Sequence, residues 1–156
     1  MVAASKGVTL IELVIVIAII GISAVAIIPF GASWVAKTQV EKTQKMLIEA
    51  YNKATTEAIK NPNSKKQTDT DPMVAKLTIT SPSGSSEGVI NVKASDSTTL
   101  WSAKFPASVT VTLNASSGTC PAIELNNNAG LIGTTCTGGY TISRSGVSNV
   151  TITAQF

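Results

Sequence analysis

The feature that most constrains this chain is an apolar run over residues 8–30 that contains one charged side chain, Glu12. About twenty apolar residues at a rise of about 1.5 Å each make a helix about as long as the hydrocarbon core of a bilayer is thick. A carboxylate at the centre of a bilayer costs about 2.5–3.5 kcal/mol even on lenient scales, so it is expected to have a role and a cationic partner. The sequence predicts a transmembrane helix with Glu12 as a functional residue. The alternative is a plain single-span anchor whose Glu reaches the membrane surface.

A candidate processing site precedes the apolar run. A standard secretory signal is cut after an apolar core of about 7–15 residues. Here the plausible cleavage point, between Gly7 and Val8, lies before the core, after a short polar segment whose one charged side chain is Lys6. Cleavage there would remove residues 1–7 and leave the apolar helix at the new N-terminus.

This N-terminal segment resembles that of the type IV pilin family. The resemblance runs from about Lys6 to Thr38. It rests on Lys6 followed by Gly7, on the run VTLIELVIVIAIIGISAVAIIP that starts at Val8 and includes Gly21 and Pro29, and on the residues Trp34 to Lys37 that follow it. It covers about a fifth to a quarter of the chain, and the remainder carries no family signature. The best-known members begin the mature chain with Phe, whereas this chain has Val8.

The resemblance implies how the protein is made and used. A prepilin peptidase would cleave after Gly7 and methylate the new amine of Val8. The chain would sit as a single-pass protein in the bacterial inner membrane, in contact with lipid, until an assembly platform and ATPase extrude it into an extracellular pilus, or fimbrium, built from copies of itself and other pilins. The family also implies that Glu12 pairs with the terminal amine of a subunit, which lies about one helical turn away.

Gly21 and Pro29 predict a weak point in the helix. Proline removes a backbone hydrogen bond, and glycine lowers helix stability by about 1 kcal/mol relative to alanine. We expect a helix that is continuous in the membrane and locally loosened between these residues in a filament. The alternative is that a transmembrane helix merely tolerates both.

The helix is expected to continue over residues 31–61 with an amphipathic pattern. Small and apolar residues recur at helical spacing and form a narrow stripe suited to packing on a sheet: Ala36, Val40, Leu47, Ala50, Tyr51, Ala54 and Ala58. Beside the stripe, charges alternate in sign at every fourth residue: Lys37, Glu41, Lys45, Glu49, Lys53 and Glu57. This charge ladder is expected to be a solvated face. Asn61 and Pro62 predict the end of the helix.

Residues 62–156 are expected to form a β-rich head. Period-two segments predict short antiparallel strands at 77–80, 89–92, 109–113, 140–143 and 150–153. Aromatic and apolar residues within this region are candidates for the core: Trp101, Phe105, Tyr140 and Ile142. The predicted fold class is α+β, with a long helical spine packed on a small antiparallel sheet, as in pilins.

Cys120 and Cys136 are the only cysteines and fall in the part of the chain expected outside the cytoplasm. Oxidising compartments favour pairing, and closing a loop of this length contributes about 3 kcal/mol in the chain-entropy model. We expect a disulfide enclosing an exposed turn at residues 126–130, in line with the disulfide-bounded C-terminal region of pilins. Two free thiols are the alternative.

Catalysis and cofactor binding are not expected. The chain has no histidine, and it lacks a glycine-rich phosphate loop and a nucleophile with a neighbouring base. Asp69, Asp71 and Asp96 could offer oxygens to calcium, but without the spacing of an EF-hand loop. Three lysines at positions 60, 65 and 66 are weak evidence for nucleic-acid binding. The alternatives to a pilus subunit are a pseudopilin of a type II secretion system and a minor pilin whose head acts in adhesion or DNA uptake.

Overall fold

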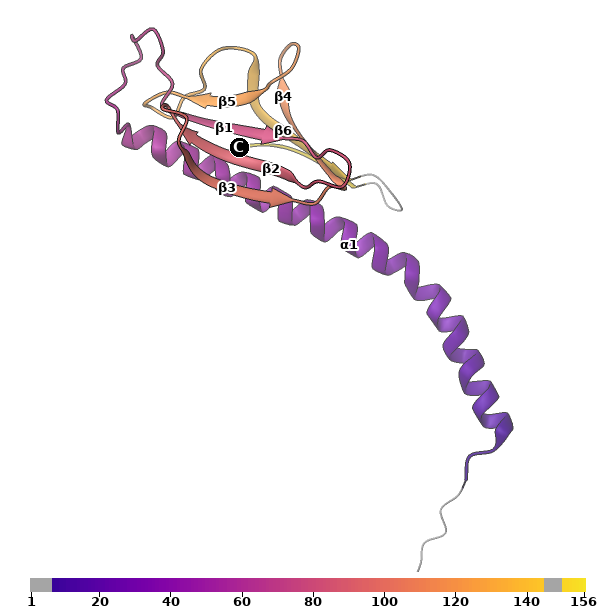
Figure 1. The fold of residues 1–156 in the computed structure, drawn as a ribbon. Coiled ribbons are helices and arrows are strands. Elements are labelled where there is room, and N and C mark those ends of the chain that lie inside the picture. The colour runs from indigo at the N-terminus through magenta and orange to yellow at the C-terminus, as the bar shows by residue number, and fades with distance from the viewer. Residues whose placement is uncertain (1–6, 145–149) are drawn as a thin grey trace, which may run out of the picture.

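The computed structural model describes residues 7–144 and 150–156, and within the helix it leaves the side chains of residues 25–30 undescribed. Lys6 and most of the predicted leader therefore lie outside the described residues. A single long helix, α1 (Leu10–Lys60), precedes seven strands in the described chain. The second half of α1 lies along the β-rich head, and the first half extends away from it and curves (Figure 1).

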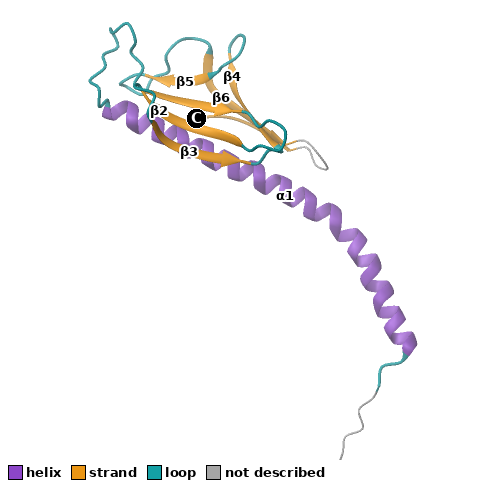
Figure 2. Cartoon of the chain, in the orientation of Figure 1, coloured by secondary structure: helices purple, strands orange, loops and turns teal. Residues whose placement is uncertain are grey.

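The head consists of two antiparallel sheets (Figure 2). The first has four strands in the order β3 (Thr99–Phe105), β2 (Gly88–Ala94), β1 (Ala75–Thr80) and β5 (Ala122–Leu125). The second has three strands in the order β4 (Val109–Ala115), β6 (Cys136–Arg144) and β7 (Val150–Gln155). The predicted α+β class with a pilin-like helix is confirmed, although the head has two sheets where one was expected.

The second half of α1 packs on the head through the predicted stripe. Six of its residues are fully buried: Ala36, Val40, Leu47, Ala50, Ala54 and Ala58. Four of these are alanines, so the helix backbone can approach the sheets closely. Thr43 is also fully buried, and its hydroxyl is satisfied because it donates to the Gln39 carbonyl at 2.8 Å.

The helix ends where the sequence predicted. Its last residue is Lys60, and Asn61 adopts a left-handed conformation with φ of 44° and donates its backbone N–H to the Glu57 carbonyl at 3.0 Å. Asparagine tolerates this region of backbone space better than most residues, and Pro62 cannot extend a helix.

Three of the four predicted core residues, Phe105, Tyr140 and Ile142, are buried. Trp101 is only half-buried, because it lies on β3 at the edge of the first sheet. It still packs against the buried core, so the prediction holds for this residue in part.

All five predicted strand segments are strands, and two strands were missed. In β3, the adjacent apolar residues Leu100 and Trp101 break the alternation that marks a strand in sequence. With only four residues, β5 is too short to show a period. It nevertheless lies beside β1, with Leu77 opposite Ile123 and Ala75 opposite Leu125.

Candidate functional site

The N-terminal end of α1 brings the predicted processing and assembly residues together. Thr9 is extended, with φ of −78° and ψ of 151°, and its hydroxyl accepts the Glu12 backbone N–H at 3.3 Å. This is N-capping, which satisfies a donor at the first turn that would otherwise lack a partner. The Glu12 carboxylate lies in the same first turn, where the positive end of the helix dipole favours a negative charge.

The predicted cleavage site lies just before this cap. Gly7 and Val8 belong to neither a helix nor a strand, and the side chain of Val8 is 71% exposed. A Cβ built on Gly7 would meet nothing within 4 Å, so packing in the monomer does not demand glycine there. In the uncleaved chain the Val8 nitrogen is a peptide nitrogen, and the pair between Glu12 and a terminal amine stays a prediction.

Apolar side chains on Val8 and on all sides of the first half of α1 have no covering partner in the monomer. Exposure lies between 45% and 80% for eleven large side chains: Val8, Leu10, Ile11, Leu13, Val14, Ile15, Val16, Ile17, Ile19, Ile20 and Ile22. A helix that is apolar on all sides is buried in its functional state, either in a membrane or in a larger assembly. This surface is therefore the main candidate for intermolecular contact.

Within the described residues, no helix meets both the length and the apolarity that crossing a membrane requires.

The helix is continuous through Gly21 and Pro29. A Cβ on Gly21 would meet nothing within 4 Å, so the monomer does not require glycine at this position. The side chain of Pro29 lies outside the described residues. Loosening of this segment concerns the filament, and it stays a prediction.

Cys120 and Cys136 form a disulfide, with their Cα atoms 5.1 Å apart. Cys136 begins β6 in the second sheet, and Cys120 lies two residues before β5 in the first, so the bond links the two sheets. The enclosed turn at residues 126–130 was expected to be exposed. Only Asn128 is exposed and the other four residues are half-buried, because the Asn126 side chain accepts the backbone N–H groups of Asn128 and Gly130 and folds the turn back on itself.

Contacts between α1 and the second sheet include residues that the sequence did not single out. The Gln44 amide donates to the Tyr140 hydroxyl at 3.0 Å. The ring of Phe156 stacks on Tyr51 of α1 with centroids 4.2 Å apart and contacts Tyr140 of β6 at 4.8 Å. A single aromatic residue after β7 has no period or motif around it, so no sequence signal could have identified this role.

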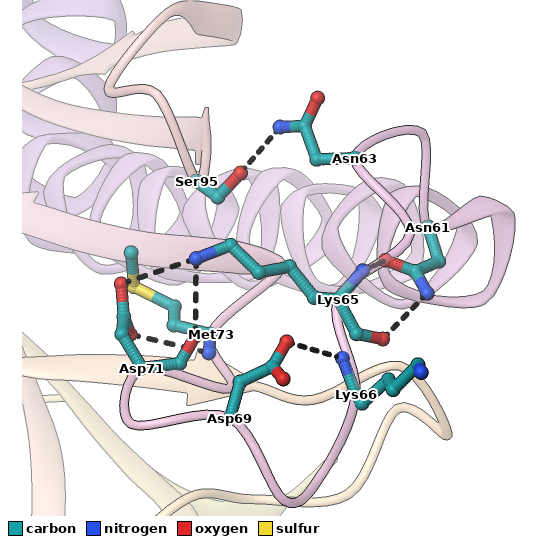
Figure 3. A network of polar contacts seen from close by, with 8 residues as sticks. All are labelled: Asn61, Asn63, Lys65, Lys66, Asp69, Asp71, Met73 and Ser95. Atoms are coloured by element: carbon teal, nitrogen blue, oxygen red, sulfur yellow. Dashed lines mark hydrogen bonds and ion pairs between the residues drawn. The ribbon is translucent and has the colours of Figure 1, made fainter.

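The loop between α1 and β1 is held by polar contacts rather than by regular structure (Figure 3). The Asn61 side chain accepts the Lys65 backbone N–H at 2.8 Å and donates to the Lys65 carbonyl at 2.8 Å. The Lys65 ammonium lies 3.6 Å from the Asp71 carboxylate, and Asp69 accepts the Lys66 backbone N–H at 2.8 Å. The side chains of Lys65, Asp69 and Asp71 therefore hold the loop itself.

This network involves the residues considered above for calcium and for nucleic acid. Asp69 and Asp71 are engaged in the loop, while Asp96 accepts the Thr98 backbone N–H at 2.9 Å in a separate turn between β2 and β3. No group of three metal-ligating side chains occurs among the described residues. Lys65 is paired with Asp71, so one of the three lysines already has an acidic partner.

Two cavities open on the described part of the molecule. The larger, about 630 Å³, opens between the sheets and is lined by uncharged residues that include Ile79, Leu113 and Pro121. The second, about 450 Å³, lies between α1 and β3, where charges of both signs face Trp101.

The charge ladder on α1 behaves mainly as a solvated surface. Of its six residues, all within the described chain, one pair lies at ion-pair distance: Lys37 and Glu41, at 3.9 Å and both well exposed. Exposed pairs of this kind contribute about 0.2–1 kcal/mol at most.

Comparison with known proteins gave one match. The family described as the prokaryotic N-terminal methylation motif matches residues 3–28, which include Gly7, Val8 and Glu12. Neither the search of curated proteins nor the search of solved structures found a match to this chain.

The matched residues coincide with the features built up above: the exposed segment before the helix, the capped first turn with its carboxylate, and the uncovered apolar surface. Residues 3–28 of this chain are therefore a prokaryotic N-terminal methylation motif, the leader signature of type IV pilins and pseudopilins, carried on a pilin-like α+β fold.

Proposed function

We propose that this chain is a structural subunit of a type IV pilus. It is cleaved between Gly7 and Val8 by a prepilin peptidase, is methylated on the new amine, resides in the inner membrane through residues 8–30, and is then polymerised through α1. The observation that carries the proposal is the methylation motif at the start of a helix whose first half is apolar and uncovered.

The exposed apolar surface favours the filament over an isolated subunit in water. Fully burying a large apolar side chain contributes about 1.5–3 kcal/mol, so removing the remaining exposed half of eleven such residues would contribute on the order of 10 kcal/mol per subunit. This contribution is non-directional and does not select one axial position over another. A second interaction is needed to set the register between subunits.

The Glu12 carboxylate meets that need. In an apolar helix bundle, an unpaired carboxylate is heavily penalised, whereas pairing with the Val8 amine of a neighbour recovers much of the penalty. Only the register that brings the two groups together avoids the penalty. In this proposal burial holds the extruded subunits together in water, and the Glu12 pair fixes the axial position.

Three variants of Glu12 test the proposal. Glu12→Val and Glu12→Gln are expected to insert and be cleaved like the wild type but to give few long filaments, since neither side chain carries a charge. Glu12→Asp keeps the charge and is expected to retain part of the assembly. The measurement is the ratio of sheared to membrane-bound subunit by immunoblot. Normal filament yield from Glu12→Val would refute the pairing mechanism.

Gly7→Asp tests processing separately. It is expected to leave an uncleaved precursor in the membrane, because it places a charged side chain at the bond to be cut. Complete maturation of this variant would contradict the assigned cleavage site. A pseudopilin or a minor tip pilin would share the processing step but would not appear as the bulk of sheared filaments.

A further inference from the structure

Trp34 is a large apolar side chain that the fold of the monomer does not use. It is 70% exposed, although Ala36, two residues later, is fully buried under the head. At about 100° per residue, the buried positions 36, 40, 43 and 47 project roughly 180–240° away from Trp34 around the helix. The indole therefore points away from the head, at the level where α1 enters it.

The position of Trp34 along the helix axis places it just beyond the apolar run. Trp34 lies four residues beyond Phe30, the end of the apolar run, and hence about 6 Å above it along the helix axis. The polar layer on each side of a bilayer is about 5–7 Å thick. If residues 8–30 occupy the hydrocarbon core, as the proposed function requires, the indole falls within the headgroup layer on the side of the head.

The side chains of Trp34 and Lys37 are of the kinds that bind the headgroup layer of a bilayer. An indole has an apolar body and one N–H donor, a combination enriched at membrane interfaces. Lys37 lies one turn closer to the head with a side chain that is 71% exposed, and a lysine there can extend toward lipid phosphates. A position in water alone would leave the apolar body of Trp34 without any favourable contact.

We propose that Trp34 is an interfacial anchor that binds the phospholipid headgroup layer and fixes the depth of α1 in the membrane before assembly. This inference rests on the proposed function, because it requires membrane insertion. The same distances place Glu12 about 33 Å from Trp34 along the helix, near the opposite boundary of the core. Val8 then lies at the opposite boundary of the core and Gly7 enters the headgroup layer there, where a membrane peptidase can reach the bond between them.

Depth-dependent fluorescence quenching tests the anchor. The full chain is reconstituted in vesicles of equal parts phosphatidylcholine and phosphatidylglycerol that carry nitroxide quenchers either at the headgroup or near the end of the acyl chain. Since the chain has two tryptophans, Trp101→Phe leaves Trp34 as the reporter, and Trp34→Phe leaves Trp101 on the head as the matched control. Trp101→Tyr provides a second background if Trp101→Phe lowers the yield of folded protein.

We expect Trp34 emission to shift to shorter wavelength on reconstitution and to be quenched several-fold more strongly by the headgroup nitroxide than by the deep one. Trp101 is expected to show neither effect. If the chain floats with vesicles but Trp34 keeps its emission in water, or is quenched best by the deep nitroxide, the anchor is refuted while insertion stands. An uncovered Trp34 would then point to a contact within the filament. A chain that does not float with vesicles would refute both the anchor and the membrane step of the proposed function.

Discussion

Replacing Phe156 by alanine is expected to destabilise the head far more than the half-buried position of this residue suggests. Its ring stacks on Tyr51 at 4.2 Å with an interplanar angle of 10°, and it contacts Tyr140 at 4.8 Å with an angle of 43°. Its backbone N–H donates to the Gly138 carbonyl at 3.1 Å. Phe156 thus joins α1 to the second sheet.

The expected magnitude follows from these contacts. Aromatic pairs contribute about 0.5–1.5 kcal/mol each beyond the area they bury. Loss of half the burial of a phenylalanine adds about 1 kcal/mol. Phe156→Ala should therefore lower the free energy of unfolding by about 2–4 kcal/mol, whereas Phe156→Leu, which keeps most of the apolar area, should lower it by about 1–2 kcal/mol.

The assay is urea denaturation of the chain in detergent, followed by near-ultraviolet circular dichroism. Gln155→Ala is the matched control, because Gln155 is the exposed neighbour of Phe156 and its replacement should change stability by no more than about 0.5 kcal/mol. A midpoint for Phe156→Ala equal to that of Gln155→Ala would refute the role assigned to the stacked rings.

Three further predictions concern the head. Replacing Cys120 and Cys136 together by serine should lower the free energy of unfolding by about 3 kcal/mol, and the loss should match that of the wild type measured under reducing conditions. Gly88→Ala should destabilise by about 1–3 kcal/mol in the same denaturation assay, because its Cβ would lie 2.1 Å from the Phe105 ring, whereas Gly31→Ala, with nothing within 4 Å, should not. Hydrogen bonds from Thr98 lower the pKa of Asp96 below its ordinary value of 3.8, so ionised Asp96 stabilises the folded head above pH 3.8, and this stabilisation is lost as the pH falls through the lowered pKa. Asp96→Asn should therefore reduce the decrease in the free energy of unfolding between pH 4 and lower pH, and an unchanged decrease would contradict the role assigned to Asp96.

The helical half of the fold was predictable because its signals are local. The apolar stripe from Ala36 to Ala58 repeats at helical spacing, and the left-handed Asn61 before Pro62 ends the helix at the expected residue. The charge ladder was visible for the same reason. The ion pairs within the ladder could not be predicted, because long exposed side chains gain little free energy from holding one geometry. Among the ladder residues, Lys37 and Glu41 are the pair at ion-pair distance.

The arrangement of the head depended on contacts between distant residues. The chain leaves the first sheet after Phe105, forms β4 in the second, returns to pair β5 with β1, and crosses again to β6. Periodicity identifies a strand but not its neighbour, so one sheet was expected instead of two. The short β5 was hidden inside the disulfide loop, where turn residues dominate the sequence.

In the candidate site, too, some residues could be predicted from the sequence and others only from the structure. Glu12, Gly7 and Val8 stand out in sequence because a charge and a processing point beside an apolar run are rare. The position of Trp34 on the face opposite the head could be recognised only once the buried residues of α1 were known, since an isolated tryptophan in an amphipathic helix is otherwise expected to lie in the core.

The measurement that tests the central claim most directly is intact mass spectrometry of the protein from sheared surface filaments and, separately, from membranes. We expect the sheared fraction to contain a species that begins at Val8, heavier by one methyl group and lighter by two hydrogens for the disulfide. Confinement of that species to membranes would contradict a major pilus subunit and favour a pseudopilin. Retention of residues 1–7 in both fractions would contradict processing, and with it the proposed assembly.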